Sequence, residues 1–120
     1  MVFLFILIGC SPTTITINEN NLKEKYSLRK SDIIEVILNA NPSTGYKWEI
    51  VSINTTKVKT VDETYTAKVA NENIGGSGGS KIYLFEAINR GDTIIKLKYS
   101  RPFEKDLPPK KQFEINLEIQ

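Results

Sequence analysis

Apolar and polar residues alternate with a period of two along most of this 120-residue chain, and this alternation restricts the fold more than any other feature. In residues 32–39, for example, Ile34, Val36 and Leu38 occupy every second position. β-Branched and aromatic residues in this spacing are typical of half-buried strands. No segment shows a convincing helical stripe, although residues 22–28 could hold a short helical turn. The sequence therefore predicts an all-β protein.

Turn-forming residues divide the alternating pattern into seven expected strands, at 13–18, 32–39, 46–53, 57–69, 81–89, 93–99 and 112–119. The fourth of these is less regular than the others, which suggests a β-bulge within it. Strands of this length and spacing are typical of an antiparallel β-sandwich of seven to eight strands. Residues 11–120 are long enough for one such domain to fold around a single core.

The connections between the expected strands differ in length, and the long ones should share one end of the sandwich. Successive antiparallel connections alternate between the two ends. The connections 40–45, 71–80 and 100–111 therefore meet at one end, while the short connections 54–56 and 89–92 lie at the other. Elaborate loops gathered at one end of a rigid sandwich can form a binding surface.

The composition excludes most kinds of catalytic site. The chain has no histidine, and its single cysteine is Cys10. Neither a Ser-His nor a Cys-His nucleophile pair can form, and a zinc site would need carboxylates alone. The net charge is only +2, with both signs interspersed, which gives no nucleic-acid footprint. We therefore expect a binding protein rather than an enzyme, without metal, cofactor or nucleic-acid partner.

Residues 1–10 have the pattern of an export leader. The apolar run at 2–8 is too short to span a bilayer and matches the hydrophobic region of a signal sequence. The run ends in Leu7-Ile8-Gly9-Cys10, which resembles the lipobox of bacterial lipoproteins. That resemblance implies a mature protein lipidated at Cys10 and anchored on the extracytoplasmic side of a membrane. An ordinary signal peptide, releasing a secreted protein, is the alternative.

Three motifs lie on the three long connections. They are Asn41-Pro42-Ser43-Thr44-Gly45-Tyr46-Lys47-Trp48, Gly76-Ser77-Gly78-Gly79 and Tyr99-Ser100-Arg101-Pro102-Phe103-Glu104. In order and placement they resemble the motifs of the chagasin family of cysteine-peptidase inhibitors. The resemblance implies an immunoglobulin-like fold and tight, reversible inhibition of papain-like cysteine peptidases. It also implies that the three loops block the active-site cleft.

The same resemblance assigns peptidase-binding roles to the residues of the three loops. Thr44 would lie nearest the enzyme's nucleophile, Ser43 replaces a family threonine, and Phe103 replaces a family tryptophan. Trp48 and Tyr99 are in strand register and are expected in the core. The full set of expected contact residues is Asn41, Pro42, Ser43, Thr44, Gly45, Tyr46, Gly76, Ser77, Gly78, Gly79, Arg101, Pro102 and Phe103.

Two alternatives remain at this point. The glycine-rich stretch 75–79 has the composition of a flexible linker. The domain as a whole could also be an immunoglobulin-like surface or adhesion module that uses the same loop end for another ligand. In either case we expect a monomer. The sequence does not identify the natural peptidase target.

Overall fold

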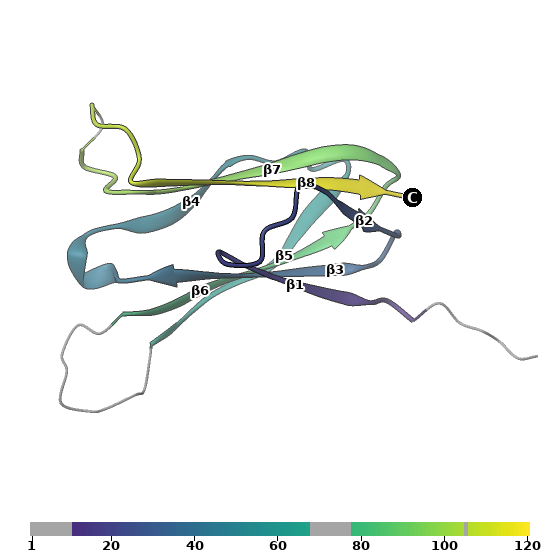
Figure 1. Ribbon diagram of the computed structural model, residues 1–120, viewed down its shortest axis with the longest axis horizontal. Coiled ribbons are helices and arrows are strands. Elements are labelled where there is room, and N and C mark those ends of the chain that lie inside the picture. The colour runs from purple at the N-terminus through teal and green to yellow at the C-terminus, as the bar shows by residue number, and fades with distance from the viewer. Residues whose placement is uncertain (1–10, 68–77, 105) are drawn as a thin grey trace, which may run out of the picture.

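Two four-stranded sheets pack face to face in the computed structural model, which describes residues 11–67, 78–104 and 106–120 (Figure 1). One sheet has the order β1-β3-β6-β5, with β1 Thr14–Asn18, β3 Ile33–Ala40, β6 Gly79–Ala87 and β5 Val58–Ala67. The other has the order β2-β8-β7-β4, with β2 Tyr26–Leu28, β8 Lys111–Ile119, β7 Gly91–Ser100 and β4 Lys47–Ser52. The prediction of an all-β sandwich with seven to eight strands is confirmed.

The core lies between the two sheets. It consists of the apolar side chains that the alternating pattern predicted to face inward. The fully buried side chains include Ile34 and Val36 of β3, Phe85 of β6, and Ile95 and Leu97 of β7. Their neighbours along each strand point outward and are half-buried or exposed. The period of two therefore identified the buried face of these strands correctly.

Two features of the topology differ from the prediction. Residues 26–28 form the strand β2 rather than part of a helical turn, so that expectation was wrong. β2 pairs in parallel with β8, and β1 pairs in parallel with β3, so the sandwich is not wholly antiparallel. Three residues are too few for a period of two to be read. Parallel pairing depends on contacts between segments far apart in the sequence.

β5 contains the expected irregularity. Its register against β6 shifts between Thr60 and Asp62, which is the position of a bulge. A second shift, between Ile50 and Ser52 of β4, was not predicted. β4 and β5 are edge strands of their sheets, and bulges at edges discourage pairing with other chains.

The long connections leave from one end of the sandwich, as the alternation of ends predicted. The strand ends that meet there are identified by the pairs Ala40 with Gly79, Ala67 with Gly79, and Tyr99 with Lys111. We call this the loop end; it lies on the left in Figure 1. The short connections, the start of β1 and the C-terminus lie at the other end.

The expected leader, including Cys10, lies outside the described residues, as do Gly76 and Ser77. Within the described part of the chain, no helix is long and apolar enough to cross a membrane.

Candidate functional site

A single tight turn forms the connection between β3 and β4 at the loop end. Pro42–Thr44 make one turn of 3-10 helix, in which the Thr44 amide donates to the Asn41 carbonyl (3.1 Å) and the Gly45 amide donates to the Pro42 carbonyl (3.0 Å). Gly45 has a φ of 84°, in the left-handed region that favours glycine. Pro42, Ser43 and Thr44 are exposed. Pro42, whose ring restricts φ, thus begins the turn, and Gly45, with its positive φ, ends it.

Side-chain hydrogen bonds fix the same turn. The Ser43 hydroxyl donates to Asn41 Oδ1 (2.5 Å), and the Thr44 hydroxyl donates to the Asn41 carbonyl (2.7 Å). The Asn41 amide donates to the Tyr99 hydroxyl on β7 (3.0 Å). Both hydroxyls of the turn therefore bond within it, and the turn as a whole is tied to the opposite sheet.

A stack of aromatic rings supports the turn from below. The ring of Tyr99 lies 5.0 Å from that of Trp48 and 5.3 Å from that of Tyr46. Trp48 and Tyr99 are only 3% and 5% exposed, which confirms the prediction that both belong to the core. The Trp48 indole N–H donates to the Asn39 carbonyl (2.8 Å). Tyr46 is half-buried at the outer end of the stack, so it combines a supporting role with an accessible edge.

The connection between β7 and β8 packs against the turn through Arg101 and Phe103. Arg101 Nε donates to the Thr44 carbonyl (3.0 Å), and its guanidinium carbon lies 4.5 Å from the Tyr46 ring centre. The Phe103 ring lies 3.3 Å from where a Cβ on Gly45 would stand, and Phe103 is 71% exposed. Two motifs that are more than 50 residues apart in the sequence thus form one surface.

Gly78 and Gly79 lie where the backbone of the loop end is most crowded. Gly78 has a φ of 80°, and a Cβ on it would stand 2.9 Å from the Ala40 carbonyl oxygen. A Cβ on Gly79 would overlap the Thr66 carbonyl oxygen at 2.1 Å. These two glycines of the second motif are therefore required by the close approach of neighbouring chain, in addition to any contact that they make with a partner.

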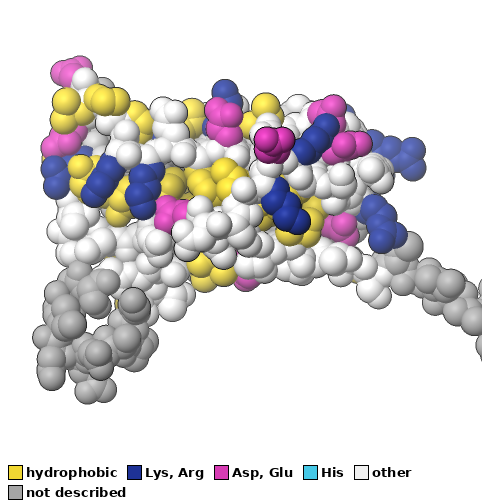
Figure 2. Space-filling model, in the orientation of Figure 1, with side chains coloured by type: hydrophobic (Ala, Val, Ile, Leu, Met, Phe, Trp, Pro, Cys, Tyr) yellow, Lys and Arg dark blue, Asp and Glu magenta, His cyan; other side chains and the backbone are white. Residues whose placement is uncertain are grey.

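Two lysines, one just before β8 and one at its start, also lie at the loop end. The sequence had indicated no binding role for them. Lys110 Nζ lies 4.9 Å from the Tyr46 ring centre, and Lys111 Nζ lies 5.7 Å from that of Tyr99. Lys111 also pairs with Glu19 (3.2 Å). Figure 2 shows Lys and Arg side chains side by side over hydrophobic ones at this end. Cations over aromatic faces are a favourable arrangement, and only the folded chain brings these groups together.

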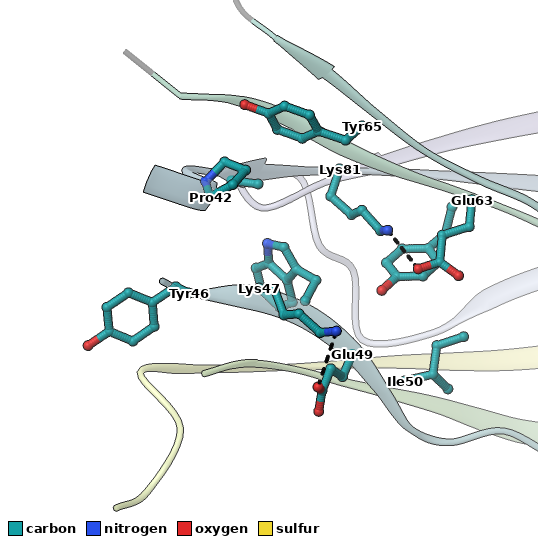
Figure 3. A pocket seen from close by; sticks show the side chains of 11 residues that line it. Pro42, Tyr46, Lys47, Glu49, Ile50, Glu63, Tyr65 and Lys81 are labelled. Carbon is teal, nitrogen blue, oxygen red and sulfur yellow. Dashed lines mark ion pairs between the residues drawn. The ribbon is translucent and has the colours of Figure 1, made fainter. Parts of the chain in front are cut away.

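A pocket of about 390 Å³ opens beside the turn, between the edge strands β4 and β5. Figure 3 shows Pro42 and Tyr46 on its side nearest the loop end. Its rim carries ion pairs of Lys81 with Glu63 (2.6 Å) and of Lys47 with Glu49 (3.9 Å). The pocket therefore adjoins the turn but is lined mainly by strand residues.

Tyr83 contributes a buried hydroxyl to this pocket. Among the residues that the structure describes, this is the one buried side-chain polar atom without a hydrogen-bond partner. Its burial, and next the negative charges of Glu63 and Glu49, raise the pKa of the Tyr83 hydroxyl. A buried hydroxyl without a partner carries a desolvation cost.

The described segments of the loop end contain no cluster of side chains suited to holding a metal ion. No three acidic, cysteine or histidine side chains lie close enough to hold a metal ion there. The chemistry available consists of backbone amides, hydroxyls, aromatic faces and cations. These groups suit recognition of another molecule's surface.

Comparisons with known proteins found a matching family and similar folds. Residues 27–117 match the model of the chagasin family peptidase inhibitor I42. Amoebiasin-2 of Entamoeba histolytica is 31% identical over 110 residues, which cover 89% of each chain. The crystal structure of the cysteine protease inhibitor EhICP2, from the same organism, superimposes with a TM-score of 0.85 at 27% identity, covering 93% of this chain and 100% of that one.

A more distant structure, of PbICP-C in complex with falcipain-2, shares the fold. Its TM-score is 0.66 at 16% identity, and the match covers 90% of this chain and 99% of that one. The relatives are inhibitors rather than enzymes, as the composition of the chain had indicated.

Proposed function

The chain belongs to the chagasin family of cysteine peptidase inhibitors, and we propose that it blocks the active-site cleft of papain-like cysteine peptidases with its loop end. Binding is tight and reversible, and one monomer occupies one cleft. The Pro42–Thr44 turn enters at the catalytic cysteine, with Thr44 nearest to it. The connections β5–β6 and β7–β8 contact the two flanks of the cleft.

The internal bonding of the turn is the observation that carries this proposal. Asn41 alone accepts from the Thr44 amide, the Thr44 hydroxyl and the Ser43 hydroxyl. A turn that is ordered before binding loses little conformational entropy when it docks. The turn is also not extended, and a peptidase cleaves a bond held in an extended segment. Thr44 can therefore occupy the cleft without becoming a substrate.

The flanking contacts come from exposed groups on either side of the turn. Pro102 and Phe103 project from the β7–β8 connection, and Phe103 offers a large exposed aromatic face. Gly78 and Gly79 begin the other flank, where the absence of side chains lets a partner approach the backbone. Large aromatic side chains are among the groups that most often dominate binding energy at interfaces.

An inhibition assay tests this proposal. A soluble form beginning near Ser11 should inhibit papain with a dissociation constant of about 1 nM, or about −12 kcal/mol. Trypsin, whose cleft has a different shape, serves as the control and should keep full activity. Papain that remains active in micromolar protein would contradict the proposal. That result would favour an adhesion module with the same fold.

We also propose that the mature protein is exported and lipidated at Cys10. β1 begins at Thr14, at the opposite end of the sandwich from the loop end. An anchor at Cys10 would therefore leave the loop end facing away from the membrane. Mass spectrometry of native protein should find a lipidated cysteine as the first residue. An unmodified Cys10 thiol, or a mature chain that starts after it, would contradict the anchor and leave the inhibitor proposal intact.

A further inference from the structure

Arg101 uses two of its three guanidinium nitrogens in hydrogen bonds within the protein. Nε donates to the Thr44 carbonyl (3.0 Å), and Nη1 donates to Glu104 Oε1 (3.1 Å). The guanidinium carbon lies over the Tyr46 ring. The two charged side chains are 34% and 30% exposed, so neither projects freely into solvent. An arginine that binds a partner would instead project its guanidinium into solvent in the free protein.

The carbonyl that Arg101 binds is the last one of the turn. A helical turn leaves its final carbonyl groups without partners inside the turn, and an external donor satisfies them. Arg101 supplies that donor to Thr44, the residue proposed to lie nearest the catalytic cysteine. The contact therefore fixes the orientation of the peptide unit that joins Thr44 to Gly45.

Glu104 is itself fixed in place. Its amide donates to the Arg101 carbonyl (3.0 Å), which closes a tight turn in the β7–β8 connection. This turn places the Glu104 carboxylate beside the Arg101 guanidinium. Arg101 has a planar arrangement of donors, so bonds at two edges fix the plane of the whole group.

We propose that Arg101 and Glu104 form a clamp that holds the Pro42–Thr44 turn in its inhibitory shape. The inference rests on the proposed function and deepens it, because it divides the β7–β8 connection into two parts. Phe103 contacts the peptidase, whereas Arg101 acts through Thr44 as a positioning residue. Glu104 thereby becomes a determinant of inhibition without touching the enzyme.

The competing interpretation is that Arg101 contacts the peptidase directly. The two interpretations predict different effects on peptidase binding when the Glu104 carboxylate is removed. If Arg101 binds the enzyme, loss of the carboxylate frees its guanidinium and binding is unchanged or tighter. If Arg101 is a clamp, loss of the carboxylate loosens the turn and binding weakens. A smaller population of the competent shape mainly lowers the association rate.

The experiment compares three variants against papain. Glu104→Gln should raise the inhibition constant about threefold, because the ion pair is partly exposed. Arg101→Lys should raise it about tenfold, since a lysine keeps the charge but cannot bond Thr44 and Glu104 together. The double variant should be no weaker than Arg101→Lys alone. Glu118→Gln is the matched control, because it makes the same substitution in a partly exposed ion pair with Lys25 (3.3 Å) at the opposite end of the sandwich, and it should leave the inhibition constant unchanged.

Hydrogen exchange of the free protein provides a readout that does not depend on a peptidase. The Gly45 amide, which donates to the Pro42 carbonyl, should exchange faster in Glu104→Gln and in Arg101→Lys than in the parent or in Glu118→Gln. If the parent fails to inhibit papain, the proposed function fails, but the exchange rates still test the clamp. Unchanged exchange at Gly45, or unchanged or tighter binding by Glu104→Gln, would overturn the clamp.

Discussion

Thr44 combines an exposed side chain with a fixed backbone. Its amide, hydroxyl and carbonyl are all bonded, to Asn41 and Arg101, whereas its side chain faces solvent at the loop end. A residue in this position can meet a narrow cleft without rearrangement. The effect of substituting it should therefore depend on the size and charge of the new side chain.

We predict a graded series at Thr44. Thr44→Ala removes one hydrogen bond and one methyl contact and should weaken papain binding by about 1 kcal/mol. Thr44→Arg would place a bulky charge in the cleft and should cost about 3 kcal/mol or more, mostly through faster dissociation. Inhibition constants and melting temperatures measure both effects, and melting should change by less than about 2 °C because the side chain lies outside the core.

Thr55→Arg is the matched control for this series. It makes the same substitution at an exposed position in the short connection between β4 and β5, at the other end of the sandwich. It should inhibit papain as well as the parent does. If Thr44→Arg inhibits equally well, the turn does not lie at the catalytic centre.

Tyr83 predicts an alkaline effect on stability. Because burial raises its pKa above the ordinary value of 10.0, the folded protein keeps this proton at a pH where the unfolded chain loses it. The unfolded state then binds fewer protons, and the free energy of unfolding falls as pH rises above about 10. Urea unfolding between pH 9 and 11 should show a shallower fall in Tyr83→Phe than in the parent.

The same variant tests the cost of the unpartnered hydroxyl. At neutral pH, Tyr83→Phe should be as stable as the parent, or more stable by about 1 kcal/mol, because no hydrogen bond is lost. Tyr65→Phe, the same substitution at the more exposed rim of the pocket, should change the free energy of unfolding by less than about 0.5 kcal/mol. Strong destabilisation by Tyr83→Phe would mean that the hydroxyl has a partner.

Asp32 joins three strands at the end opposite the loops. It is 8% exposed, and its carboxylate accepts from the Thr13 amide (3.0 Å) and from the Arg29 amide (2.8 Å). These amides lie just before β1 and just after β2, while Asp32 itself precedes β3. One side chain therefore aligns the starts of two strands with the end of a third.

We predict that Asp32→Ala lowers the free energy of unfolding by about 1–3 kcal/mol, because two backbone amides lose their acceptor. Asp92→Ala is the control, since the Asp92 side chain is 75% exposed and forms a surface ion pair, and it should cost about 0.5 kcal/mol or less. Denaturant unfolding measures both. Equal effects of the two substitutions would show that Asp32 does not organise these strands.

The strands differ in how well the sequence predicted them. β3, β6, β7 and β8 are long and alternate regularly, so their buried faces, and their bounds to within two residues, followed from the period of two. β2 was missed because its pattern spans three residues, and its place is fixed by distant groups. Tyr26, for example, pairs with Leu117 of β8, and the Leu28 carbonyl accepts from the Gln120 amide (2.8 Å).

Some features of the candidate site could be predicted from the sequence, and others could not. The Asn41–Gly45 segment carries its own turn chemistry, so the turn could be predicted locally from proline and glycine. The contact between Glu104 and Arg101 could not be predicted, because this contact depends on how the β7–β8 connection folds back toward the turn. The cationic groups over Tyr46 and Tyr99 likewise require the tertiary fold.

In the molecule as a whole, the hydrophobic core and the loop end are separate regions. The core occupies the middle of the sandwich, and the opposite end is closed by short connections and by Asp32. The strands that lead into the β3–β4, β5–β6 and β7–β8 connections meet at the loop end, although these connections are distant in the sequence. The proposed binding surface therefore lies outside the core, where substitutions should have little effect on the stability of the fold.

We propose that the loop end covers the catalytic cysteine of a papain-like peptidase. Alkylation of that cysteine in the complex tests this proposal. Papain saturated with the inhibitor, as verified by gel filtration, should react with iodoacetamide at least about 100 times more slowly than free papain, since nanomolar binding leaves little free enzyme. The rate should recover when the complex dissociates. Alkylation of the saturated complex at the rate of free papain would contradict the claim.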